Sequence, residues 1–262
     1  GSSDNVAIGQ DAMGGSHSTA TSDRNVAIGK QSMGTGAMNN ADENVAVGYG
    51  ALKALTSGDG NIIIGSYAGH EITTGASNVA IGSYDGTVVA AMRSNVEASK
   101  CVAIGTGALA GVLDTGVDGT VSIGYKAGFS ITEGQKNTVI GYEALDALTA
   151  GNENTVIGWD AMGNANNTNR NIAIGHKAAN GMGTLASYDN VFIGRNSGGG
   201  TWTTAASLFN IGVGNNTLGA AMNGAEKNIA MGHQALVNIT TGGENIGIGH
   251  QAGLSLNTGI NN

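Results

Sequence analysis

The sequence predicts an all-β protein, a parallel β-solenoid of about fourteen turns of 17–23 residues. A five-residue motif of the type Asn-Val-Ala-Ile-Gly recurs fourteen times, and two β-branched residues alternate within most copies. The copies begin at residues 5, 25, 44, 61, 78, 101, 120, 137, 154, 171, 190, 210, 228 and 245. A repeat near this period is typical of a solenoid, in which each turn packs only against its neighbours.

Each motif is expected to form one short strand. With the Asn as position zero, positions +1 and +3 are Val or Ile, except for Thr138, Thr155 and Met231. Residues two apart share one face of a strand, and β-branched side chains favour this conformation. We therefore expect positions +1 and +3 to face the core. One buried column should comprise Ile104, Ile123, Ile140, Ile157 and Ile174.

The remainder of each turn follows a second pattern. Gly occupies position +4 in every copy, which indicates a backbone bend that a Cβ would obstruct. A small residue, mostly Ala, stands at +7 with Asp85 as the exception, and it predicts a second short strand across the roll. A further apolar residue at +11, such as Leu55 or Ile72, precedes a polar closing turn. The largest insertion is expected within 86–100.

Position zero is Asn in twelve of the fourteen copies, with Cys101 and Thr120 as the exceptions. Asparagines stacked one turn apart can hydrogen-bond side chain to side chain, so we expect an asparagine ladder. Cys101 is the only cysteine, so it cannot form an internal disulfide. We interpret it as a tolerated replacement of Asn without a reactive role.

Composition excludes several classes of partner. The net charge is −8 without a basic run, which argues against nucleic acid. No apolar run approaches the roughly 20 residues of a membrane span. We expect residues 1–4 to be a leader or a cloning scar and residues 5–262 to form a single repeat domain.

The phrase Asn-Val-Ala-Ile-Gly-x-x-Ala resembles the head repeats of YadA-like trimeric autotransporter adhesins and the repeats of phage tail fibres. The resemblance covers residues 5–262. It implies a left-handed β-roll, three chains side by side, and an extracellular, cell-surface or virion location. It further implies a non-enzymatic structural or adhesive segment that presents a surface for host or cell-surface attachment. The turns are longer than those of adhesin heads, which favours the tail-fibre relatives.

No acid, base and nucleophile are arranged for catalysis, so we expect no enzyme activity, no cofactor and no metal. The residue after the invariant Gly is aromatic on four successive turns: Tyr125, Tyr142, Trp159 and His176. These rings either stabilise themselves as a column or bind a cell-surface glycan. In the column, Lys126, Glu143, Asp160 and Lys177 would pair beside the rings. His233 and His250 also neighbour each other, but two ligands are few for a metal site.

Self-association is expected from position +2, which carries Ala, Gly or another apolar residue in all copies but that of Ser122. We expect these residues to face outward and to meet another chain, with the number three supplied by the resemblance alone. Open parallel-strand edges predict flanking fibre domains or end-to-end stacking. The alternative function is an ice- or glycan-binding β-solenoid. Ice binding needs a regular Thr column, whereas the threonines here lie mainly in turns of unequal length.

Overall fold

The computed structural model describes residues 4–15, 21–94, 96–111 and 117–262. The chain divides into two compact units, Gly1–Gln135 (unit 1) and Lys136–Asn262 (unit 2), and each is described by itself. Residues 1–3 of the expected leader lie outside the described residues, and the prediction of one repeat domain stays a prediction. In the described part of the chain, no helix has the length and apolarity needed to cross a bilayer.

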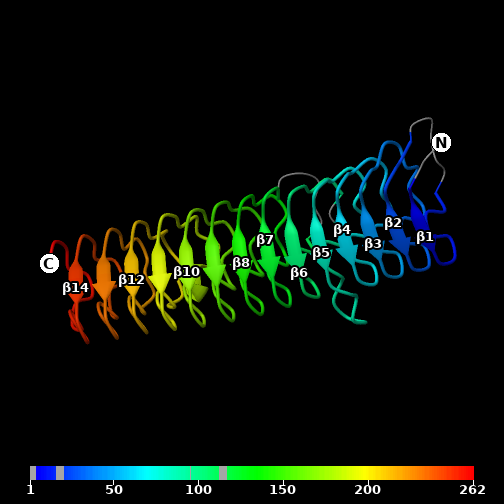
Figure 1. The fold of residues 1–262 in the computed structure, drawn as a ribbon. Coiled ribbons are helices and arrows are strands. Elements are labelled where there is room, and N and C mark those ends of the chain that lie inside the picture. The colour runs from blue at the N-terminus through cyan, green and yellow to red at the C-terminus, as the bar shows by residue number, and fades with distance from the viewer. Residues whose placement is uncertain (1–3, 16–20, 95, 112–116) are drawn as a thin grey trace. The chain divides into compact units, whose positions relative to one another are not determined.

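Each unit contains seven three-residue strands that pair in parallel with their sequence neighbours (Figure 1). Unit 1 holds β1 (Val6–Ile8), β2 (Val26–Ile28), β3 (Val45–Val47), β4 (Ile62–Ile64), β5 (Val79–Ile81), β6 (Val102–Ile104) and β7 (Val121–Ile123). Unit 2 holds β8 (Thr138–Ile140), β9 (Thr155–Ile157), β10 (Ile172–Ile174), η1 (Asn180–Met182), β11 (Val191–Ile193), β12 (Ile211–Val213), β13 (Ile229–Met231) and β14 (Ile246–Ile248). The parallel β-solenoid is confirmed, although fourteen strands delimit about thirteen turns, one fewer than predicted.

The predicted inward face of the strands is wrong. In β2 to β14 the central residue, position +2, is buried, whereas positions +1 and +3 are exposed or half-buried. None of the five isoleucines of the expected buried column is buried, and Ile140 is 36% exposed. The physical reason is the asparagine at position zero, whose side chain points inward. Because alternate residues share a face, position +2 must then point inward as well.

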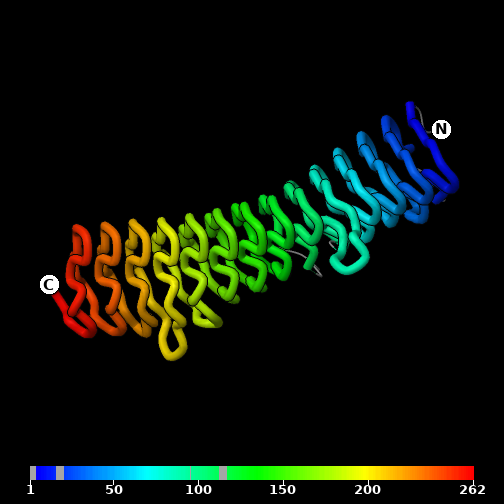
Figure 2. The backbone as a smooth tube through the Cα atoms, turned by 90° about the horizontal axis from the view of Figure 1, so that it is seen from below, coloured from blue at the N-terminus to red at the C-terminus, as the bar shows by residue number. Residues whose placement is uncertain are grey.

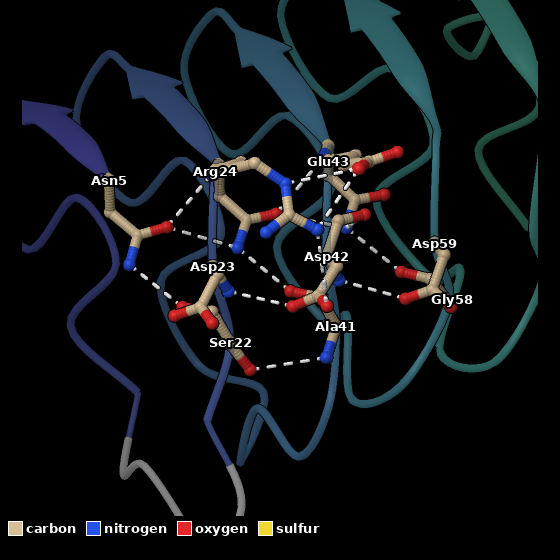
Figure 3. A network of polar contacts seen from close by, with 11 residues as sticks. Asn5, Ser22, Asp23, Arg24, Ala41, Asp42, Glu43, Gly58 and Asp59 are labelled. Carbon is tan, nitrogen blue, oxygen red and sulfur yellow. Dashed lines mark hydrogen bonds and ion pairs between the residues drawn. The ribbon is translucent and has the colours of Figure 1, made fainter. Parts of the chain in front are cut away.

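The asparagine ladder is confirmed, and Figure 3 shows its first rungs near Asn5. Asn44 illustrates a complete rung. Its Oδ1 accepts hydrogen bonds from the backbone N and the Nδ2 of Asn61, both at 2.9 Å. Its Nδ2 donates to Asn25 Oδ1 at 3.1 Å and to the Gly58 carbonyl at 2.9 Å. Each buried amide therefore has partners on both sides, as a polar group away from water requires.

A second polar ladder, which the sequence analysis did not predict, runs beside the first in unit 1 (Figure 3). The backbone N of Asp23 donates to Asp42 Oδ1 at 2.7 Å, and the backbone N of Asp42 donates to Asp59 Oδ1 at 2.8 Å. At the rim of this ladder, Arg24 Nη2 lies 3.0 Å from Glu43 Oε1 and 3.7 Å from Asp42 Oδ2. The carboxylates thus connect successive turns through backbone donors, and the guanidinium offsets part of their charge.

The predicted bend at position +4 is present, whereas the predicted second strand is replaced by a turn. Gly175 has φ +135°, and a Cβ there would lie 2.7 Å from the Gly194 carbonyl oxygen. Beyond every bend except that of Gly82, which the insertion follows, positions +6 and +8 adopt left-handed conformations, as at Glu143 and Leu145, both with φ 50°. The chain still bonds to the next turn, with Leu145 N donating to Ala161 O at 2.9 Å. Left-handed residues cannot continue an extended strand, which is why no second strand forms here.

The largest insertion lies between Gly82 and Ala91, earlier than expected. Ala91 N donates to Gly82 O at 3.3 Å, as Ala68 N does to Gly65 O at 3.2 Å one turn before. Ala91 therefore occupies the small +7 site, and Asp85 belongs to the inserted loop. In Figure 2 the blue-green loop of unit 1 and a yellow loop of unit 2 extend beyond the neighbouring turns. Despite the insertion, Val79 and Val102 pair in register.

Cys101 takes the place of a ladder asparagine and behaves as an inert residue. Its backbone N donates to Asn78 Oδ1 at 3.0 Å, and its thiol lies 3.1 Å from the Val117 carbonyl. Burial is the main cause that raises the pKa of the Cys101 thiol to about 11, so little thiolate forms near neutrality. Thr120 N bonds to Val117 O instead of a side chain, because cysteine provides no amide oxygen.

The asparagine ladder predicts a large cost for removing one inner rung. Asn154 Oδ1 accepts from Asn171 N at 3.0 Å, and Asn154 Nδ2 donates to Thr168 O at 2.8 Å. Asn154→Ala leaves these buried groups unpaired, so we expect the free energy of unfolding to fall by about 3 kcal/mol or more. Denaturant titration measures it. Asn164→Ala, which removes an exposed amide, is the control and should cost well under half as much.

Restoring the missing rung should stabilise unit 1. In Cys101→Asn the new amide can accept from Thr120 N and donate to the Val117 carbonyl that the thiol now contacts. We expect the free energy of unfolding to rise by about 1 kcal/mol, the net value of a typical buried hydrogen bond. Thermal unfolding measures the change, and Cys101→Ala serves as the reference. The comparison separates the effect of adding an amide from the effect of removing the thiol. An unchanged or lower melting temperature for Cys101→Asn would refute this account of the ladder.

Candidate functional site

The outward side chains of the strands form the most unusual surface of each unit, here called the strand face. It consists of the first and third residue of every strand. In unit 1 all of these residues are Val or Ile: Val6, Ile8, Val26, Ile28, Val45, Val47, Ile62, Ile64, Val79, Ile81, Val102, Ile104, Val121 and Ile123. In unit 2 the strand face is Val or Ile except at Thr138, Thr155 and Met231. No strand-face residue in either unit carries a charge.

The strand face is large for an uncovered apolar surface. Seven strands about 4.8 Å apart span roughly 30 Å, and the two rows of side chains make the face about 10 Å wide. Ile62 is 43% exposed in the middle of unit 1, and Ile248 is 68% exposed in β14. A flat patch of roughly 300 Å² on each unit is as large as the largest patches of typical monomers. The strand face is therefore the leading candidate for a binding surface.

The predicted ring column is present in part. Trp159 and His176 stack with ring centroids 4.7 Å apart and planes at 16°. Tyr142 lies in unit 2 on the preceding turn and is exposed. Tyr125 belongs to unit 1, where Lys126 Nζ lies 5.5 Å from its ring centroid. The structure therefore brings Trp159 and His176 together but does not place Tyr125 relative to the other rings.

The ion pair predicted beside the rings is confirmed at one end of the column. Lys177 Nζ lies 3.6 Å from Asp160 Oδ2 and 5.0 Å from the Trp159 ring centroid. The indole thus stacks on His176 and has the ammonium group over its ring, a stabilising arrangement. A pyranose ring needs an open aromatic face, so this geometry favours a self-stabilising column. The other predicted pair, Lys126 and Glu143, consists of residues from different units and stays a prediction. The glycan platform also stays a prediction.

A second aromatic cluster, which the sequence analysis missed, lies in unit 1. Tyr67 packs edge-on against Tyr49 at 5.0 Å and against Tyr84 at 6.3 Å between centroids. The Arg93 guanidinium lies 5.3 Å from the Tyr67 centroid, and His70 lies 5.2 Å from it. A hydrogen bond with Tyr49 is the main cause that raises the pKa of Tyr67, and burial lowers the pKa of His70.

The sequence signal for this cluster was its spacing. Tyr49, Tyr67 and Tyr84 are separated by nearly one period, but only Tyr49 directly follows an invariant glycine. The other two stand one position later, where Tyr67 has φ 60°. A search confined to a single column of the repeat therefore cannot find them. The Tyr67 ring contacts Tyr49, Tyr84 and the Arg93 guanidinium, so the members of the cluster pack against one another.

Within the described residues, no group of three or more His, Cys, Asp and Glu side chains is arranged to hold a metal ion. His233 and His250, which the sequence analysis paired, do contact each other, with their Nδ1 atoms 3.3 Å apart. No family model, curated protein or solved structure matches the chain. The surfaces of the two units, and above all the strand face, therefore provide the grounds for a function.

The packed indole predicts that Trp159 stabilises unit 2 without binding sugar. Trp159→Ala removes the stack on His176 and the contact with Lys177, and we expect the free energy of unfolding to fall by about 1–2 kcal/mol. On a glycan array we expect no wild-type signal that depends on Trp159. Tyr188→Ala, which removes the half-buried ring that packs edge-on against the exposed Phe209, is the control. A glycan signal that a folded Trp159→Ala variant loses would instead support the glycan platform.

Proposed function

We propose that this chain is a non-enzymatic structural or adhesive fibre segment whose copies associate side by side through the strand face. The observation that carries the proposal is the uninterrupted array of Val and Ile side chains on unit 1, all of them exposed or half-buried. A contiguous apolar patch of this size ranks with the largest patches of soluble monomers, and such patches are often functional.

The energetics favour covering this surface. When one strand face of a unit covers an equal face, roughly 600 Å² leaves water, and at about 25 cal/mol per Å² the gross gain is about 15 kcal/mol. Association costs about 4–15 kcal/mol in lost translational and rotational freedom. The gross gain from the face of a single unit therefore exceeds this cost only at the favourable end of the range. The second unit carries an equivalent face. The face of one unit buries less than the roughly 1,200 Å² of a stable specific interface, so the proposal requires the faces of both units to take part.

A second copy of the chain is the partner that fits best. The strand face is flat, repeats once per strand and has no charge with which to orient a polar partner. Its complement must be a similarly long apolar surface, and another copy supplies one with the same repeat. Most soluble oligomers are homo-oligomers; two strand faces meeting face to face would give a dimer, whereas a trimer needs heterologous contacts around a threefold axis. The sequence placed the expected association at position +2, but the structure buries that position, so the proposal rests on the strand face instead.

The number and setting of the copies rest on the resemblance of the motif. Similarity to YadA-like heads and tail-fibre repeats supports a homotrimer at the cell surface, outside the cell or on a virion. In such a fibre, the segment would form part of a tail-fibre shaft or an adhesin head and contribute to host or cell-surface attachment. Flanking fibre domains or end-to-end stacking would cover the open strand edges.

Ice binding, the alternative function, is less well supported by the strand face. A flat parallel sheet offers the regular spacing that such a function needs. However, only Thr138 and Thr155 place a hydroxyl on the strand faces of the two units. The regular column of threonines that the hypothesis requires is therefore absent from the surface formed by the strands.

Light scattering on the purified chain tests association directly. We expect a mass of three times 25.9 kDa, independent of concentration over the working range. A mass near 25.9 kDa would overturn the proposal. A dimer would keep the strand face as the interface while rejecting the threefold number.

Two neighbouring substitutions in β8 separate folding from association. Ile140→Asp places a charge on the strand face, so we expect weaker association with the solenoid retained. Val139→Asp buries an unpaired charge in the core and should unfold the turn at a cost of several kcal/mol. Circular dichroism reports the fold, and light scattering reports the mass. If folded Ile140→Asp associates as tightly as the wild type, the strand face is not the interface.

A further inference from the structure

His233 and His250 occupy equivalent positions on two adjacent turns of unit 2. Each follows the bend glycine of its turn, directly after β13 and β14 respectively, and both side chains are exposed. Gln251 N donates to the His233 carbonyl at 2.9 Å, which holds the two backbones in register. Beside the rings, Gln251 Nε2 donates to Gln234 Oε1 at 2.9 Å. The two imidazoles are therefore mounted on a fixed backbone spacing.

The rings are not stacked by simple translation along the solenoid. Their planes are within 6° of parallel and their centroids are 5.2 Å apart, yet the two Nδ1 atoms are only 3.3 Å apart. Rings related by translation would repeat every atom at the centroid distance. The much shorter Nδ1 distance means that the Nδ1 edges are turned toward each other. Two nitrogen atoms of the same kind thus approach one point in space.

This separation matches the edge of a metal coordination polyhedron. Imidazole nitrogens bind Zn²⁺ at about 2.0–2.1 Å, and a tetrahedral angle then places two such nitrogens about 3.3–3.4 Å apart. We propose that His233 and His250 form a two-histidine site for a divalent transition-metal cation, with water at the open positions. Mg²⁺ and Ca²⁺ are poor candidates for this site, because those ions prefer oxygen ligands to ring nitrogens. Imidazole suits Zn²⁺, Ni²⁺ and Cu²⁺, and Cu²⁺ binds most tightly.

Binding would link β13 to β14 through their exposed turns. A cation held by both rings bridges two backbones that are otherwise joined here by main-chain bonds and the glutamine pair. Because only the folded turn brings the rings together, the cation stabilises it by an amount that grows with the logarithm of its concentration relative to the dissociation constant. The sequence showed that the two histidines are neighbours. It did not show that their Nδ1 edges face each other.

The site is tested on the full chain after treatment with a chelator. Cu²⁺ is titrated first, and electron paramagnetic resonance counts the coordinating nitrogens; Zn²⁺ is then titrated calorimetrically. We expect one cation per chain with two imidazole nitrogens. His233→Ala and His250→Ala should each weaken binding about tenfold or more, since even loss of a supporting partner typically costs 10–100-fold. His176→Ala, which removes an exposed histidine from the same position of another turn, should have no effect.

Two results would overturn the proposal. The first is Cu²⁺ binding that the double variant His233→Ala/His250→Ala retains, which would place the cation elsewhere. The second is that the wild-type chain binds neither Cu²⁺ nor Zn²⁺ although its circular dichroism spectrum shows that it is folded. The 3.3 Å contact would then be a direct Nδ1–H···Nδ1 hydrogen bond between two tautomers. Both variants change exposed side chains, and a melting temperature measured without metal verifies their fold.

Discussion

The hydrogen-bonding requirement of one buried amide organises every turn of this solenoid except those that begin with Cys101 and Thr120. The asparagine side chain at the start of a strand bonds to the turn before and the turn after, as Asn44 does with Asn25 and Asn61. An amide that is removed from water needs those partners, so the asparagine must point inward. Strand alternation then directs position +2 into the core and positions +1 and +3 outward. The register of every turn and the apolar strand face both follow from this constraint.

The fold thereby separates two apolar surfaces that lie on the same short strand. The inner residue of most strands is small, as Ala46 is in β3, which lets opposite walls of the roll approach closely; Ile63, Val139, Val156 and Phe192 are the large exceptions. The bulkier β-branched residues lie outside, where they favour the extended backbone and leave apolar area free for a partner. A narrow roll gains little from its own core, so a second burial surface is useful for stability. Folding and the proposed association therefore draw on different side chains of each turn.

The sequence predicted the period, the strands, the bend glycine, the asparagine ladder and the pairing of Asp160 with Lys177. It did not identify the inner face, because two β-branched residues in alternation have the same pattern whether they face the core or a partner. The decisive clue was available in position zero, since a buried asparagine at Asn171 commits Ala173 to the inside. The left-handed turn could not be predicted, because residues such as Leu145 have no preference for φ 50° and adopt it through inter-turn bonds. The approach of His233 Nδ1 to His250 Nδ1 depends on ring rotation, which spacing cannot reveal.

The unequal spacing of the repeats is itself explained by the ladder and the strand face. An extra residue within a strand would move the following side chains to the opposite face and break the amide contacts on both sides. The same residue in a turn only lengthens an exposed loop, at a small entropic cost. The insertion between Gly82 and Ala91 shows the consequence, because β5 and β6 still pair through Val79 and Val102. Loops can thus vary in length and chemistry while the strand face of the same unit stays continuous. In a fibre assembled through that face, changes in the loops could alter what the fibre attaches to without changing how its chains assemble.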